Sequence, residues 1–106
     1  NSAALTPEGQ AALDAAVLTL RQFSTLQVSL AGHSDDQGPP ELNRRVSLRR
    51  AQVVEERLRR AGIARGRITV VGHGPDHPLD TSGSEEGRAK NRRVEMTFFE
   101  EAVAPP

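Results

Sequence analysis

Hydrophobic residues recur at helical spacing in two stretches of the chain. In the first, from about residue 7 to 23, the apolar positions are Leu13, Ala16, Val17, Leu20 and Phe23. In the second they are Ala51, Val54, Leu58 and Ala61. Residues three and four apart share one face of a helix, so each stretch predicts a helix with a single buried stripe.

The ends of the second helix carry their own signals. Ser47 is suited to cap its start, because a serine hydroxyl accepts from the free N–H groups of a first turn. A short helical turn over residues 41–46 is expected to lead into it. Gly62 follows the last apolar position and predicts the end of the helix.

Three other stretches alternate apolar and polar positions, the pattern of a strand with one buried face. They cover residues 26–31, 67–71 and 94–99, and the last is expected to turn Val94, Met96 and Phe98 inward. Glycine follows each of the first two, at Gly32 and Gly72. Residues 75–84 read as a loop and 84–91 as one or two helical turns.

This order of elements predicts an α/β two-layer sandwich with helices packed on one face of a small mixed sheet. A chain of 106 residues is the size of one domain. We assign residues 1–101 to that domain and residues 102–106 to a disordered tail. The chain has no initiator methionine and reads as an excised domain.

Composition excludes several classes of function. The 14 basic and 14 acidic residues balance, which argues against a nucleic-acid binder, since such proteins usually carry a basic excess. Cysteine is absent, which excludes disulfides and thiolate metal sites. No stretch is apolar for long enough to span a membrane, so membrane attachment is expected only through segments outside this chain.

Candidate chemistry gathers around the expected start of the second helix. Asp35 follows the first strand, and four arginines stand near the helix start: Arg44, Arg45, Arg49 and Arg50. The helix dipole disfavours cations there, so an anionic ligand is one explanation. Pairing of the arginines with Asp35, Asp36 and Glu41 is the other. Arg50 lies beside the buried stripe and is the better candidate, whereas Arg49 points toward solvent.

Two further groups have competing interpretations. His33, His73 and His77 suggest a metal, but no ligand spacing is recognisable, and structural hydrogen bonds are favoured. One of Arg92 and Arg93, which alternate in direction at a strand start, could point into the same site as Arg50. Neither a Gly-x-Ser-x-Gly elbow nor a complete glycine-rich nucleotide loop is present.

Taken together, three ordered motifs closely resemble the OmpA-like domain. They are Gly32-His33-Ser34-Asp35 with Gly38, Asn43 through Val46-Ser47 to Arg50-Ala51, and Asn91-Arg92-Arg93-Val94-Glu95. The likeness runs from about Asn1 to Phe99. It implies a βαβαβ-type fold whose first strand, ahead of the first helix, would precede this chain.

The resemblance also implies a function and a site. Family members bind peptidoglycan non-covalently, without catalysis, cofactor or metal, by gripping the diaminopimelate of the stem peptide. By position, Asp35 would accept the ammonium and Arg50 would hold the carboxylate, with Asn43 and Arg92 as further contacts. Ser34 replaces the usual threonine and Val46 the usual leucine.

We therefore expect a peptidoglycan-anchoring module of the periplasm or cell envelope, part of a larger membrane-anchored protein. The alternative is a protein–protein adaptor of the same fold that has lost wall binding. A sheet edge without its first strand would favour that reading, and would also permit a homodimer.

Overall fold

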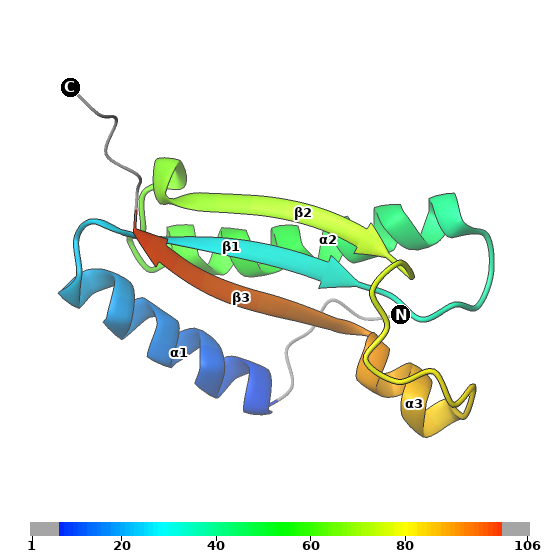
Figure 1. Cartoon of the computed structure of the whole chain (residues 1–106). Coiled ribbons are helices and arrows are strands. Elements are labelled where there is room, and N and C mark those ends of the chain that lie inside the picture. The colour runs from blue at the N-terminus through cyan, green and yellow to red at the C-terminus, as the bar shows by residue number, and fades with distance from the viewer. Residues whose placement is uncertain (1–6, 101–106) are drawn as a thin grey trace.

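Residues 7–100, which the computed structural model describes, form two layers in which helices pack against a three-stranded mixed sheet (Figure 1). The elements in chain order are α1 (Pro7–Gln22), β1 (Leu26–His33), α2 (Pro40–Arg60), the 3-10 turn η1 (Arg65–Arg67), β2 (Ile68–Gly74), α3 (Glu85–Asn91) and β3 (Arg93–Glu100). The predicted fold class and two-layer arrangement are confirmed.

The sheet has the order β2-β1-β3, with β1 in the centre. β1 runs parallel to β2 and antiparallel to β3. The carboxyl end of β1 therefore lies beside the carboxyl end of β2 and the amino end of β3, where His33 is opposite both Gly74 and Arg93. A register shift between Gly32 and His33 bends the chain at this end.

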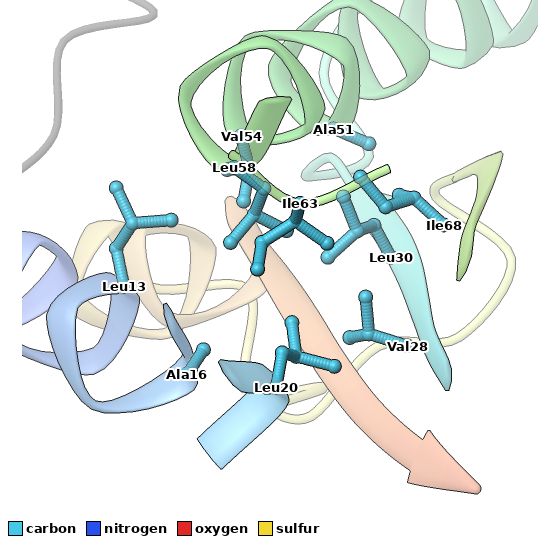
Figure 2. Close-up of a cluster of buried hydrophobic side chains, with 10 residues drawn as sticks. All are labelled: Leu13, Ala16, Leu20, Val28, Leu30, Ala51, Val54, Leu58, Ile63 and Ile68. Carbon is cyan, nitrogen blue, oxygen red and sulfur yellow. The ribbon is translucent and has the colours of Figure 1, made fainter. Parts of the chain in front are cut away.

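The two long helices and the sheet share one core (Figure 2). Leu13, Ala16 and Leu20 of α1 point toward Val54 and Leu58 of α2 and toward Val28 and Leu30 of β1. Ala51, Ile63 and Ile68 complete the cluster. The predicted stripes of both helices are thus buried, with three exceptions: Val17 is partly buried, Phe23 is exposed, and Ala61 stands at the C-cap of α2.

Gly32 and Gly72 lie inside strands and allow α2 to approach the sheet closely. A Cβ built on Gly32 would lie 1.9 Å from the carbonyl oxygen of Ser47, and one on Gly72 would lie 2.7 Å from Leu48. The sequence interpretation had placed both glycines just after strands. Instead, β1 continues to His33 and β2 continues to Gly74. Glycine inside each strand allows close packing because it has no side chain to keep α2 away from the sheet.

The predicted start of the second helix at Ser47 is wrong. α2 begins at Pro40, with Pro39 at the N-cap in extended conformation, φ −64° and ψ 134°. Proline suits the first helical position, where no N–H is needed. Gly62, with φ 97°, follows the C-cap as predicted.

Ser47 is instead fully buried, and its side chain links α2 to β2. Its hydroxyl donates to the carbonyl of Arg44 at 2.9 Å and accepts from the N–H of Gly74 at 2.9 Å. The carbonyl of Gly74 in turn accepts from the N–H of Ser34 at 2.8 Å. The hydroxyl therefore anchors the end of β2 that supports the loop after β1.

Changing Ser47 to alanine is expected to lower the free energy of unfolding by about 1–3 kcal/mol, because the N–H of Gly74 would remain buried without an acceptor. Urea denaturation followed by circular dichroism measures this. Ser24→Ala is a suitable control, since Ser24 is exposed in the turn between α1 and β1. A Ser47→Ala protein as stable as the parent would show that this hydrogen bond contributes little.

At the far end of β3 a second expectation fails. Val94 and Met96 pack against the core, but Phe98 keeps 38% of its surface exposed. In the described part of the chain β3 is hydrogen-bonded to β1 alone, so Phe98 is covered from one side. The predicted tail, residues 102–106, lies outside the described residues. No helix within residues 7–100 is long and apolar enough to cross a membrane.

Candidate functional site

The four residues singled out by the motifs come together at the end of the sheet where β1 stops and β3 begins. They line an open cleft of about 340 Å³ together with Ser34 and Val46: Asp35, Asn43, Arg50 and Arg92. Asp35 follows β1, Asn43 and Arg50 project from α2, and Arg92 connects α3 to β3. Residues 34–50 and Arg92, which are far apart in sequence, thus supply one site.

Asp35 is held from two sides. Its Oδ1 accepts from the N–H of Gln37 at 2.9 Å, a local turn contact. Its Oδ2 pairs with Nη1 of Arg92 at 2.6 Å, and the other terminal nitrogen of Arg92 pairs with Glu85 at 2.7 Å. With its side chain 13% exposed, Asp35 has a fixed position at the cleft wall.

Asp35 is ionised at neutral pH. Burial by itself raises the pKa of this carboxyl, but the hydrogen bonds from Gln37 and Arg92 outweigh that effect, and the pKa falls below its usual value. Arg92 gains correspondingly: the hydrogen bonds to Glu85 and Asp35 raise its pKa. The ion pair therefore persists across the physiological range of pH.

Arg50 differs from Arg92 in having no acidic partner among residues 7–100. Its side chain is half-buried, and its Nη1 makes one long hydrogen bond of 3.4 Å to the carbonyl of His33. Within residues 7–100 no carboxylate forms an ion pair with it. Burial, together with the charge of Arg92, lowers the pKa of Arg50, while Asp35 raises it. The cleft thus contains a positive charge without a direct counter-ion.

Asn43 fixes the loop that presents Asp35. Its side-chain amide donates to the carbonyl of Gln37 at 2.8 Å, and the N–H of Gln37 donates to Asp35. The amide therefore ties the loop after β1 to the first turns of α2. Asn43 also lines the cleft, so its side chain both fixes the loop and forms part of the cleft wall.

The other arginines of α2 do not enter the cleft. Arg44 pairs with Glu41 at 2.8 Å and lies 3.7 Å from Asp76, while Arg49 is exposed as predicted. Because α2 begins at Pro40, these arginines stand beyond its first turn, where the helix dipole has little effect. The dipole argument for an anion site was therefore wrong, and for Arg44 pairing with an acid is the correct explanation.

Arg92 and Arg93 point in different directions. Arg92 faces Asp35, whereas Arg93 turns to Glu95, with its Nε 3.1 Å from the carboxylate. Sequence reasoning missed that Asp35 takes its partner from Arg92, 57 residues away, and missed Glu85 entirely. The Asn-Arg-Arg motif was the one available signal for the first of these contacts.

The histidines gather at one end of the sheet without forming a metal site. The rings of His33 and His73 stack with centroids 5.3 Å apart, and His77 meets His73 edge-on at 4.5 Å. Among the described residues no group of three or more histidines and acids is arranged to hold a metal ion. His33 makes the structural hydrogen bond expected of it, to Glu95 at 3.0 Å.

The cleft offers a fixed carboxylate and a guanidinium without an ion-pair partner, with an amide between them in sequence. Such a pair recognises a group that carries both an ammonium and a carboxylate, through charge-assisted hydrogen bonds. The arrangement favours recognition of a zwitterion over a simple anion, because a simple anion would face Asp35 as well.

Comparison with known proteins places these features in context. A model of the OmpA family matches residues 1–92. Outer membrane porin F of Pseudomonas fluorescens is 41% identical over 83 residues, which cover 78% of this chain and 26% of the porin. The chain thus spans about a quarter of that protein.

Two solved structures are similar in fold. The cell wall anchor of the T6SS from Pseudomonas aeruginosa is 38% identical with a TM-score of 0.77, over 94% of this chain and 72% of that one. The peptidoglycan-associated lipoprotein from Burkholderia pseudomallei has a TM-score of 0.88 at 23% identity, over 93% and 84% of the two chains. At that identity the second likeness concerns the fold alone.

Proposed function

Because the chain belongs to the OmpA family, we propose that it binds peptidoglycan non-covalently through the diaminopimelate of the stem peptide. In doing so it would hold an envelope protein to the cell wall from the periplasmic side. The observation that carries the proposal is the half-buried guanidinium of Arg50, which has no ion-pair partner within residues 7–100 and faces the same cleft as the ionised Asp35.

The free end of diaminopimelate is complementary in charge to this cleft. It carries an ammonium and a carboxylate on one carbon, as an amino acid does. Asp35 accepts the ammonium, since a carboxylate has lone pairs beyond those used by Gln37 and Arg92. Arg50 holds the carboxylate, and Asn43 and Arg92 complete the contacts at the rim.

The same geometry predicts discrimination between wall types. A stem peptide with lysine in place of diaminopimelate has the ammonium but lacks the carboxylate. Arg50 would then lose water on binding without gaining a partner, which carries a free-energy cost. The proposal includes no covalent step, cofactor or metal. Binding at one such site is modest, and firm anchoring needs many copies or a tether to the membrane.

Co-sedimentation with purified diaminopimelate-type sacculi tests the proposal. The parent domain is expected in the pellet, and Asp35→Asn in the supernatant, because the substitution removes the charge that pairs with the ammonium. Asp36→Asn is the matched control: its side chain is exposed and lies outside the cleft, so it should sediment like the parent.

Two results would contradict the proposal. One is equal sedimentation of Asp35→Asn and the parent with circular dichroism showing both folded. The other is equal binding of the parent to lysine-type sacculi, which would remove the diaminopimelate specificity while leaving wall binding intact.

A further inference from the structure

Three imidazoles gather at the end of the sheet where β1 and β2 stop. His33 ends β1, His73 lies in β2, and His77 follows in the next loop. The ring centroids of His33 and His77 are 6.1 Å apart, and His73 lies within 5.3 Å of both. Nothing in the proposed wall site uses these side chains.

His33 is the buried member of the cluster and carries an unpaired nitrogen. Its residue surface is 2% exposed, and its Nδ1 is buried without a hydrogen-bond partner among residues 7–100. Its Nε2 lies 3.0 Å from Glu95. Burial raises the pKa of Glu95, but the hydrogen bond and charge of Arg93 outweigh burial and lower it. Glu95 is therefore ionised, Nε2 donates to it, and Nδ1 carries a lone pair.

The backbone of His33 adjoins the cleft, next to its lining residue Ser34. Its carbonyl accepts the hydrogen bond from Arg50. The next residue, Ser34, donates its N–H to Gly74, and Asp35 follows directly. A displacement of His33 would therefore shift the carbonyl that accepts from Arg50 and the start of the loop that carries Asp35.

We infer that His33 is a positioning residue of the cleft: its neutral imidazole keeps Arg50 and Asp35 in the relative positions that a ligand needs. Protonation of the imidazole therefore weakens binding of the wall peptide. The inference rests on the proposed function and adds a regulation of the same site. It makes attachment to the wall responsive to periplasmic acidity.

The surroundings of His33 show why a proton is disruptive there. Burial and the charge of Arg93 hold the pKa of His33 below its ordinary value, although Glu95 acts in the opposite direction. The neighbouring ring of His73 on β2, whose centroid lies 5.3 Å from that of His33, acts on the pKa of His33 in the same direction as Arg93. A proton on Nδ1 would create a buried donor with no acceptor in reach.

Linkage gives the direction in which the stability of the fold around His33 changes with pH. A base whose pKa is lowered by folding favours the fold in its neutral form. That stabilisation is complete above the ordinary imidazole value of 6.5 and is lost as pH falls through the lowered pKa. Asp35 and Glu95 have lowered pKa values as well, so both stay ionised between pH 7.0 and about 5.0.

Calorimetric titration of the domain with a soluble L-Ala-D-Glu-diaminopimelate tripeptide tests the inference. Affinity is expected to fall roughly tenfold between about pH 7.0 and about 5.0. The affinity of His33→Gln should not change with pH over this range, because an amide keeps a donor for Glu95 and does not titrate there. His77→Asn, altered at the exposed edge of the cluster, should keep the parent profile.

Glu95→Gln provides an independent variant should His33→Gln fail to fold. Loss of this carboxylate removes the group that favours the protonated imidazole, so the acid limb of the profile should move to lower pH. Glu95 lies outside the cleft lining, so binding at neutral pH should be retained.

The outcomes separate the two proposals. A parent that binds equally at both pH values, or a His33→Gln protein that keeps the parent's slope, overturns the inference and leaves wall binding standing. Absence of tripeptide binding at neutral pH overturns the proposed function, and the inference with it.

Discussion

Replacing Arg50 with methionine is expected to abolish co-sedimentation with diaminopimelate-type sacculi while the domain stays folded. Methionine keeps the packed stem but removes the guanidinium that would hold the ligand carboxylate. Loss of a charge-assisted contact of this kind costs roughly 1.5–3 kcal/mol, or about ten- to a hundredfold in affinity. For a site of modest strength, this moves the protein from pellet to supernatant.

The same substitution is expected to leave the stability of the empty domain equal or higher. Burial lowers the pKa of Arg50, which means that the fold disfavours the charged form that Arg50 keeps at neutral pH. Its hydrogen bond to His33, at 3.4 Å, is too long to offset much of that cost. Binding and stability should therefore change in opposite directions, the behaviour of a residue kept for a ligand.

Arg49→Met is the matched control, since Arg49 is the neighbouring arginine of α2 but is exposed and outside the cleft. It should sediment like the parent. Calorimetry with the soluble tripeptide measures the binding affinity, and thermal melts measure the stability, of the parent, Arg50→Met and Arg49→Met. Undiminished binding by Arg50→Met would remove Arg50 from the site.

Gly32→Ala is expected to destabilise the fold more than alanine at Gly72, Gly74 or Gly87, the other glycines where an added Cβ would lie within 3 Å of another atom. The new Cβ would lie 1.9 Å from the carbonyl oxygen of Ser47, a backbone atom of α2 that cannot rotate away. Overpacking usually costs about 1–3 kcal/mol, and the need to displace a whole helix places this site at or beyond the upper limit. Domains typically have a free energy of unfolding of about 5–15 kcal/mol, so a loss of this size would remove a large part of it.

Gly66→Ala is the control for this experiment. No atom lies within 4 Å of a Cβ built at Gly66, and its φ is not positive. The added methyl group should leave the free energy of unfolding unchanged or raise it by about 0.4–1 kcal/mol, because alanine restricts the unfolded chain. Thermal and urea denaturation compare both variants with the parent. A Gly32→Ala domain within about 0.5 kcal/mol of the parent would mean that α2 is less firmly seated than the structure indicates.

The helices and strands were predictable because residues that face the core are apolar and recur at the spacing of a helix or a strand. Leu13, Leu20, Val54 and Leu58 follow helical spacing because each faces the same core. The start of α2 was not predictable from that spacing, since it depends on local chemistry. Ser47 has the side chain of a cap, but its hydroxyl is bonded to Gly74 on β2, a contact that sequence spacing does not reveal.

The site was predictable to a different extent. The family motifs identified Asp35, Asn43, Arg50 and Arg92, and the structure brings all four to one cleft. Spacing alone did not find the pairing of Asp35 with Arg92, because it joins the end of β1 to the start of β3. It also assigned Arg50 to a first turn in which it does not lie. The role of each side chain toward a ligand remains a proposal.

The antiparallel pairing of β1 with β3 has a mechanical consequence. The cleft lies at the carboxyl end of β1, and the opposite end of the ladder pairs Leu26 with Glu100. A pull applied between a ligand in the cleft and Glu100 would draw the two strands past each other along their length. All of the rungs between them, eight residue pairs, would then bear the load together instead of opening one after another. The strand order therefore resists separation of β1 from β3 when a force acts along the strands.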